Sequence, residues 1–298
     1  MSTPAILTNP DKRRRFQAAI GQRFALCMRA LAAGVTLCIG VAATAAPAVP
    51  RPTQLAGSAG PVCRAGGSDR RTPVVELYTS EGCSSCPPAD RWLSALAASG
   101  LGDQVLALAM HVDYWDRLGW PDRFADRRFT DRQRALAQAG RLRSIYTPQV
   151  VIDGQDVRRW WDGERVVDAL RVQQVMPAVL RLRIEARRGA GAVRLISSAD
   201  PVSDEPLPPA WRLITGLTQD GLASTVARGE NAGRELRHDR VVRAWLERAR
   251  PGVGEHDDRF ALDGETGTGT LHAFAMAVDG RGRPLQAAFC TLPAPGPR

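Results

Sequence analysis

The feature that most constrains this 298-residue chain is a Cys-x-x-Cys tetrapeptide, Cys83 to Cys86, placed between an apolar run and two prolines. Residues 74–79 are short, apolar and β-branched, as expected for a buried strand. Pro87 and Pro88 have no backbone N–H and are tolerated only in the first turn of a helix, so the helix is expected to start near Cys86. Two thiols at such a junction suit thiol–disulfide exchange or half of a metal site.

The order of the two cysteines predicts a role for each in exchange. Cys83 is the more N-terminal and is therefore expected to be the more exposed thiol and the nucleophile. Free amides and the dipole at a helix start favour its thiolate. Cys86 would resolve the mixed disulfide that Cys83 forms. Glu76 interrupts the apolar strand. It either transfers a proton beneath the cysteines or occupies a solvent-facing strand position.

Apolar periodicity predicts an α/β thioredoxin-like domain at 73–177, because strands and helices alternate in the order of that fold. Its helices are expected at 90–99, 126–141 and 162–174, and further strands at 105–110 and 150–152. Pro148 follows Thr147 where this fold carries a cis-proline beside its Cys-x-x-Cys. The exposed backbone at Pro148 would pair with an extended substrate segment.

From about residue 178 the hydrophobic pattern changes to period two, with glycine and aspartate turns between short segments. Many short strands with regular turns indicate an all-β sandwich domain, here at 178–292, followed by a tail at 293–298. One segment, residues 240–248, fits helical spacing as well as a strand.

Residues 1–45 have the pattern of a signal peptide. They carry six basic residues against one acidic residue, then an apolar stretch, then an A-x-A cleavage site at residues 43–45. The alternative is an uncleaved membrane anchor, because the apolar stretch is nearly long enough to span a bilayer. We expect cleavage, and therefore a periplasmic or secreted protein without stable membrane insertion. Residues 46–72, rich in Pro, Ala, Gly and Ser, are expected to form an irregular linker.

The formal net charge of +9 does not indicate nucleic-acid binding. Much of the excess lies in residues 1–45, and no basic stripe is interleaved with aromatic residues elsewhere. We expect no nucleic-acid partner.

Removal of the signal peptide would leave an even number of cysteines, which permits disulfides in an exported protein. If Cys83 pairs with Cys86, then Cys63 is left to pair with Cys290. That bridge would tie the start of the mature chain to its end, and in the chain-entropy model it would stabilise the fold by about 4–5 kcal/mol.

His111 and Asp113 end a predicted central strand, and the carboxyl ends of strands line the site in open α/β sheets. They would tune the Cys83 thiolate, or they would join Cys83 and Cys86 as ligands of copper or zinc. A purely structural histidine is the third possibility. We expect no cofactor, with copper or zinc as the alternative.

The run from Glu76 to Asp90, which contains Cys-Ser-Ser-Cys-Pro-Pro-Ala-Asp, resembles a bacterial family of secreted thioredoxin-like proteins whose function is unassigned. Three later segments resemble the same family: residues 111–116, 146–154 and 228–234. The resemblance extends over nearly all of the expected mature chain. It implies a thioredoxin-like fold, export and a redox role, but no particular substrate.

These patterns predict an exported thiol–disulfide oxidoreductase with Cys83, Cys86, Pro148 and Glu76 in its catalytic site. The expected partner is a cysteine-containing envelope protein or a redox partner. One alternative is a copper- or zinc-binding protein of the same fold. Another is a non-catalytic envelope interaction protein whose thiols are structural.

Overall fold

The computed structural model describes residues 62–294, apart from residues 250 and 267–268. The expected signal peptide at 1–45 and the expected linker up to residue 61 lie outside the described residues. Within those residues, no helix is both long and apolar enough to cross a membrane.

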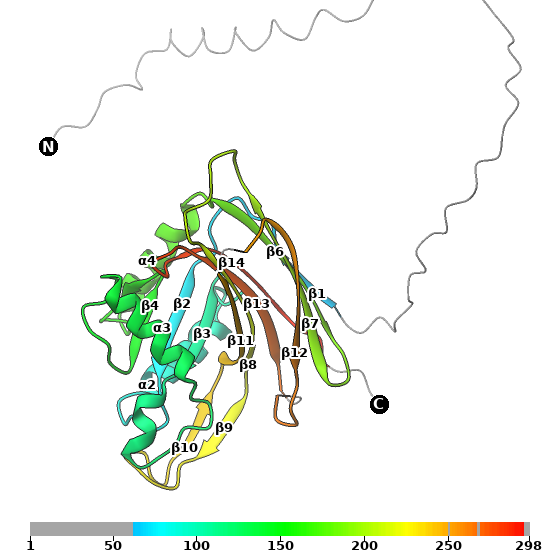
Figure 1. Cartoon of the computed structure of the whole chain (residues 1–298). Helices are drawn as coiled ribbons and strands as arrows, with labels where there is room; N and C mark the ends of the chain where they lie inside the picture. Colours follow the sequence, from blue (N-terminus) through cyan, green and yellow to red (C-terminus); the bar gives the residue numbers. More distant parts are fainter. Residues whose placement is uncertain (1–61, 250, 267–268, 295–298) are drawn as a thin grey trace, which may run out of the picture. The chain divides into compact units, whose positions relative to one another are not determined.

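An eight-stranded sheet is the main element of the fold (Figure 1). Its strands are, in spatial order, β14 (Pro284–Thr291), β13 (Leu271–Val278), β8 (Arg212–Gln219), β11 (Val241–Ala249), β3 (Leu106–His111), β2 (Val74–Thr79), β4 (Gln149–Ile152) and β5 (Gln155–Asp156). β2 and β3 run parallel, as do β3 and β11, and the other neighbours are antiparallel.

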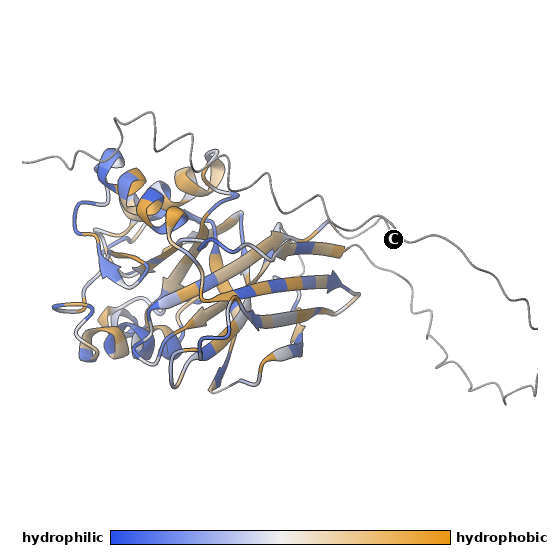
Figure 2. Cartoon of the chain, turned by 90° about the horizontal axis from the view of Figure 1, so that it is seen from above, coloured by the Kyte–Doolittle hydropathy of each residue, from blue (hydrophilic) through white to orange (hydrophobic). Residues whose placement is uncertain are grey.

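Two smaller sheets complete the β structure of the described residues. The first is antiparallel, with strands in the order β1 (Val62–Gly66), β6 (Leu180–Arg188), β7 (Ala192–Pro201) and β12 (Gly254–Ala261). Figure 2 shows polar and apolar residues alternating along its strands, as β6 does with one buried face. The second is a two-stranded ribbon of β9 (Leu222–Thr225) and β10 (Glu235–His238).

Three α-helices and a 3₁₀ segment fill the connections among the described residues. They are α2 (Pro87–Ala98), η1 (Asp113–Leu118), α3 (Arg127–Gln138) and α4 (Gly163–Val175). Aspartates cap two of the helices, because Asp126 accepts from the Arg128 amide and Asp162 accepts from the Arg165 amide. In α2 the prolines occupy the first two positions instead, and no side chain caps its start.

The eight-stranded sheet is covered on both faces. Phe129 and Leu136 of α3 pack on one face, against Tyr78 and other residues of the central strands. On the opposite face, α2 and α4 pack over β2, β3 and β4. The sheet that contains β6 and β7 packs over β8, β13 and β14 on that same face. The start of α2, with the cysteines, therefore lies on the face opposite α3.

The expected arrangement of an α/β thioredoxin-like domain followed by a separate all-β sandwich domain is wrong. The structure is β-rich, and its largest sheet takes strands from both expected domains. They meet where Val241 of β11 lies opposite Ala109 of β3, and the Ala109 amide donates to the Arg240 carbonyl at 2.8 Å. An exposed strand edge carries unpaired backbone groups, and β11 satisfies those of β3. Local periodicity shows which face of a strand is buried, but not which strand lies beside it.

The expected linker is also ordered in part, since β1 pairs antiparallel with β6 from Val62 to Gly66. A disulfide joins Cys63 on β1 to Cys290 on β14, with a Cα–Cα distance of 5.8 Å. This bond connects the two ends of the described chain across the sandwich of sheets. Residues 240–248, which fitted both a helix and a strand, lie mainly in β11.

Candidate functional site

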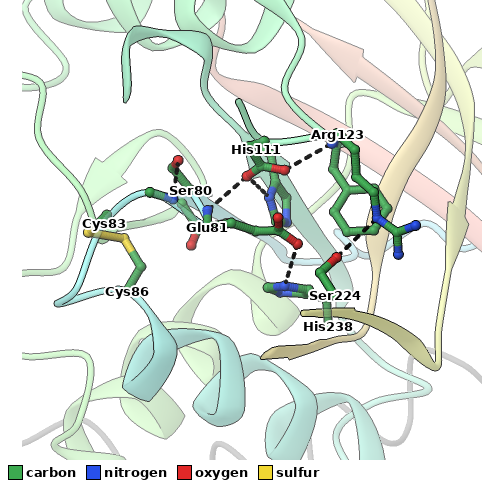
Figure 3. Close-up of polar contacts among 12 residues, drawn as sticks. Ser80, Glu81, Cys83, Cys86, His111, Arg123, Ser224 and His238 are labelled. Atoms are coloured by element: carbon green, nitrogen blue, oxygen red, sulfur yellow. Dashed lines mark hydrogen bonds and ion pairs between the residues drawn. A yellow bond between two sulfur atoms is a disulfide. The ribbon is translucent and has the colours of Figure 1, made fainter. Parts of the chain in front are cut away.

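The Cys-x-x-Cys loop connects β2 to α2, and its two cysteines are joined by a disulfide with a Cα–Cα distance of 5.4 Å (Figure 3). Cys83 is 2% exposed and Cys86 is fully buried, whereas Ser84 and Ser85 between them are exposed. Cys83 is thus the more exposed of the two cysteines, as expected, but both are buried in this disulfide state. The loop reaches the surface through its serines, and its sulfur atoms lie beneath.

The start of α2 has fewer amide donors than an ordinary helix. Cys86 is the N-cap residue, and Pro87 and Pro88 follow it without N–H groups. The next two amides, of Ala89 and Asp90, both donate to the Cys86 carbonyl, at 2.8 and 3.1 Å. The usual source of thiolate stabilisation at a helix start is thus reduced in this chain.

A loop from the second half of the chain holds the cysteine loop in place. We call residues 226–234, between β9 and β10, the capping loop. The buried side-chain amide of Asn231 donates to the carbonyl oxygens of Glu81, at 2.8 Å, and of Cys83, at 2.9 Å. Glu230 accepts a hydrogen bond from the Ser84 amide at 2.9 Å. The capping loop therefore contacts the backbone on both sides of the Cys83 side chain.

One tryptophan, Trp115, connects the cysteine loop to Pro148. The Thr147–Pro148 peptide bond is cis, as the sequence predicted. Trp115 donates from its indole nitrogen to the Thr147 hydroxyl at 2.7 Å. A methyl group added at Gly82 would lie only 3.3 Å from Cβ of Trp115, so Trp115 packs closely on the residue before Cys83. The structure thus links the cysteine loop and Pro148 through one tryptophan.

A cluster of buried acids and histidines lies beside the cysteine loop, and its members are Glu81, Asp90, His111, Asp122 and His238. Nδ1 of His111 lies 2.6 Å from the Asp122 carboxylate, and Nε2 of His238 lies 3.3 Å from that of Glu81. The two imidazole rings meet edge to face with centroids 5.0 Å apart. Figure 3 shows His111, His238 and Glu81 converging on one side of the disulfide loop. We call this group the acid–histidine cluster.

Charge pairing opposes burial within the acid–histidine cluster. Burial raises the pKa of Asp122, but His111 outweighs it and holds the pKa below its ordinary value. Burial lowers the pKa of His111, but the contact with Asp122 and the charges of Asp90 and Glu81 outweigh burial, so the pKa is raised. Burial raises the pKa of Asp90 by more than the attraction of His238 lowers it, so the pKa of Asp90 is raised. The cluster therefore holds a favourable His111–Asp122 contact beside Asp90, a carboxyl whose charged form burial disfavours.

Glu76 lies away from the cysteines. Its carboxylate binds the guanidinium of Arg132 at 2.5 Å and faces the Tyr78 hydroxyl at 3.5 Å. Side chains alternate along β2, so Glu76 shares with Tyr78 the face that α3 covers, whereas α2 packs on the other face. The position of Glu76 gives it a structural ion pair and does not place it next to Cys86.

The structure does not assemble the alternative copper or zinc site. His111 is paired with Asp122, and Asp113 accepts a hydrogen bond from the Thr130 hydroxyl at 2.5 Å. Among residues 62–294, with the gaps noted above, no group of three or more His, Cys, Asp or Glu side chains is arranged to hold a metal ion. Cys83, Cys86, His111 and Asp113 therefore do not form a ligand set in this state.

Sequence reasoning missed the residues that the second half of the chain contributes. Asn231 and His238 lie far along the chain from Cys83, and nothing in their local pattern indicates a contact with it. The sequence contains one indication: residues 228–234, which include Asn231, resemble the same family as the cysteine segment does. Those residues read as an ordinary hairpin loop, because two glycines bracket the polar positions.

Comparison with known proteins supports the fold and a family. A family model described as "Protein of unknown function (DUF1223)" matches residues 74–271. The X-ray crystal structure of protein AGR_C_4864 from Agrobacterium tumefaciens is similar, with a TM-score of 0.51 and 21% sequence identity, over 78% of this chain and 98% of that chain. At this identity the likeness supports a shared fold alone. A search of curated proteins finds no match.

Proposed function

The chain belongs to the DUF1223 family of proteins of unknown function, and we propose that it exchanges disulfide bonds with protein thiols through Cys83 and Cys86. The observation that carries the proposal is the disulfide between these cysteines at the start of α2, in a loop whose intervening serines are exposed. A bond across a sequence separation of 3 restricts the unfolded chain little, so stabilisation is a poor reason for it. The same spacing lets one cysteine displace a partner bound to the other.

The two disulfides of this chain differ in sequence separation and in location, and this difference suits a structural role for one and an exchange role for the other. The bond between Cys63 and Cys290 spans a separation of 227 residues and joins two strands of different sheets. That bond suits a structural role, because it removes a large loop entropy from the unfolded state. The bond between Cys83 and Cys86 lies in a connecting loop, where binding and reacting residues are usually found.

The exchange begins from the oxidised state. A partner thiolate attacks Sγ of Cys83, the bond to Sγ of Cys86 breaks, and Cys86 leaves as a thiolate that then takes a proton. The second thiol of the partner loses its proton and attacks the partner's sulfur in the mixed disulfide, which releases Cys83 as a thiolate that takes a proton. The partner is oxidised to a disulfide, and the protein is reduced to a dithiol. Two electrons pass to the protein, and no further oxidant is needed for this half-reaction.

Access to Cys83 sets a condition on this chemistry. Because Cys83 is only 2% exposed, the residues around its sulfur must move before a partner reaches it. The capping loop supplies the contacts that resist this movement, through Asn231 on the Cys83 carbonyl and Glu230 on the Ser84 amide. The carboxylate of Glu230 is exposed, so its hydrogen bond to the Ser84 amide holds the loop less strongly than the bond from Asn231 does.

The proposal extends to compartment and partner. Disulfides persist in oxidising environments such as the periplasm or the extracellular space, and two disulfides in one chain fit that setting. The signal-peptide pattern in residues 1–45 agrees with export. We therefore place the reaction in the envelope or outside the cell, with a cysteine-containing protein of that compartment as the partner.

Exchange is tested by mixing the oxidised protein with a reduced dithiol peptide. The proposal expects the peptide to become oxidised while one protein disulfide opens, and mass mapping should find new thiols at Cys83 and Cys86 only. The double variant Cys83→Ala/Cys86→Ala is the matched control and should leave the peptide reduced. If the wild-type protein oxidises the peptide no faster than this variant does, the proposed function is wrong.

A further inference from the structure

A pocket of about 390 Å³ lies beside the cysteine loop, between the first turns of α2 and strand β10. Its lining residues are Pro87, Asp90, Arg91, Glu235, Leu236 and Arg237. Pro87 directly follows Cys86, so the pocket begins next to the disulfide. None of these lining residues takes part in the proposed exchange of disulfides.

The charges around the pocket leave one cation without a partner. Nη2 of Arg237 donates to the Glu235 carboxylate at 2.9 Å, so these two side chains offset each other. Asp90 accepts from the Thr79 hydroxyl at 2.7 Å, and burial raises the pKa of Asp90. Arg91 is exposed and has no hydrogen-bond or ion-pair partner within the described residues. Its guanidinium is the uncompensated charge at the pocket.

The backbone of β10 offers a second recognition element. Among the described strands, β10 pairs with β9 alone, in a two-stranded ribbon. The outer edge of such a strand presents unpaired N–H and C=O groups at alternate residues. Three successive residues of β10, Glu235 to Arg237, line the pocket, although their side chains point to alternate faces. The pocket therefore borders three successive residues of a strand that has one unpaired edge.

We propose that this pocket binds an extended, acidic segment of the partner protein, next to the cysteine that reacts with Cys83. The segment would pair its backbone with the edge of β10, as peptides do when they add a strand to a sheet. A carboxylate of the segment would bind Arg91, and an apolar side chain would lie on Pro87 and Leu236. This inference rests on the proposed function for its biological meaning, because it names the class of partner that the exchange site receives.

The test measures binding separately from exchange. The probe is a short fluorescent peptide without cysteine that carries glutamates, compared by anisotropy with the same peptide carrying glutamine at those positions. The oxidised full-length protein should bind the glutamate peptide about fivefold more tightly, as one exposed ion pair allows, and added salt should remove the difference. Equal affinity for the two peptides would overturn the proposal.

Charge reversal at Arg91 sharpens the test. The variant Arg91→Glu should lose the preference for glutamate and bind a lysine version of the peptide more tightly than wild type does. Arg171→Glu is the matched control, because Arg171 is an exposed arginine of α4 outside the pocket. If Arg171→Glu changes binding as much as Arg91→Glu does, the effect is one of net charge and the pocket assignment is wrong. No thiol takes part in this binding, so the two proposals fail separately. Loss of exchange with retained binding would contradict the proposed function alone. Retained exchange without the preference for glutamate would contradict the pocket assignment alone.

Discussion

The side-chain amide of Asn231 donates a 2.9 Å hydrogen bond to the carbonyl oxygen of Cys83, 148 residues earlier in the chain. A second bond from the same amide reaches the Glu81 carbonyl, so one buried side chain holds the loop on both sides of Gly82. The capping loop and the cysteine loop therefore form one unit, although they come from opposite halves of the sequence. The position of the Cys83 sulfur depends on a residue outside the segment that carries the cysteines.

Replacing Asn231 by Ala should destabilise the protein and expose Cys83. The variant leaves the Glu81 carbonyl without this donor and the Cys83 carbonyl with the Cys86 amide alone, and an unsatisfied buried group costs about 1–3 kcal/mol. We expect a lower free energy of unfolding in urea and faster reduction of the Cys83–Cys86 disulfide by a small thiol. Glu230→Gln keeps an acceptor for the Ser84 amide and should change both quantities little. Unchanged reduction in Asn231→Ala would mean that the capping loop does not control access.

The His111–Asp122 pair should make stability depend on pH in a defined direction. Burial lowers the pKa of His111 and Asp122 reverses this, so the folded pKa lies above the ordinary value of about 6.5. The stabilisation from His111 is complete below that value and is lost as the pH rises through the folded pKa. Asp122 has a lowered pKa, so its contribution is complete above about pH 3.9 and is lost as the pH falls through its folded value. The pair should stabilise the fold most between about pH 4 and 6.5.

Asp122→Asn tests this pH dependence. Removing one partner of a buried ion pair costs about 3–5 kcal/mol, and the loss should be largest at mildly acidic pH, where His111 is charged. At a pH above the folded pKa of His111 the difference from wild type should shrink. Urea unfolding across this range measures it, with the exposed Asp131→Asn as control. A deficit that is the same at every pH would show that the contact is a simple hydrogen bond.

Glu76→Gln separates structure from catalysis. Glu76 is buried with Arg132 on the α3 side of the sheet, so the variant should lose about 3–5 kcal/mol of stability. Its rate of thiol exchange, measured where both proteins are folded, should match wild type. Glu81→Gln is the comparison, because Glu81 accepts from the Trp120 indole at 2.8 Å and faces His238, beside the cysteine loop. A slowed rate in Glu76→Gln alone would restore the proton-transfer role.

The Cys63–Cys290 disulfide should carry much of the stability against unfolding. The double variant Cys63→Ala/Cys290→Ala should lose about 4–5 kcal/mol, because its bond closes most of the described chain into one loop. Cys83→Ala/Cys86→Ala opens a loop of a few residues and should lose clearly less. Thermal and urea unfolding of the two double variants compares them directly. Equal losses would contradict the division into structural and exchanging bonds.

Sequence patterns predicted most of the local structure around the cysteines. The apolar residues of 74–79 form β2, the prolines after Cys86 start α2, and Thr147–Pro148 is cis. Each of these depends on neighbours in the chain: a missing amide, an apolar run or the tertiary amide of proline. Such features are readable from a short window.

The pairing of strands that are distant in the sequence could not be predicted from such short windows. The pairing of β11 with β3 joins two halves that were expected to be separate domains, and its cause is the open edge of β3. Val241 and its neighbours fitted helical spacing as well as strand alternation, so their pattern did not decide even the type of element. The fully buried β13 also lacks a solvated face, because α3 covers one side of it and the sheet that contains β6 and β7 covers the other.

The acid–histidine cluster shows the same limit at the site. Glu81 and Asp90 flank the cysteines in sequence, but His238 arrives on a ribbon from the second half. Glu76 is an acid within an apolar strand, and its ion pair with Arg132 on α3 explains its burial. A charged residue in a strand indicates that a partner exists, but the sequence does not say on which face that partner lies.

The most direct test of the exchange mechanism is to trap its intermediate. The same mixed disulfide forms when the exchange runs in reverse and the Cys83 thiolate attacks a disulfide peptide. In Cys86→Ser the resolving thiol is absent, so the peptide should remain attached, and mass spectrometry should find one peptide per protein at Cys83, released by reductant. In Cys83→Ser the buried Cys86 should form this adduct much more slowly. The proposed function predicts rapid, stoichiometric attachment at Cys83. Attachment at the same slow rate in both variants, or none at Cys83, would contradict it.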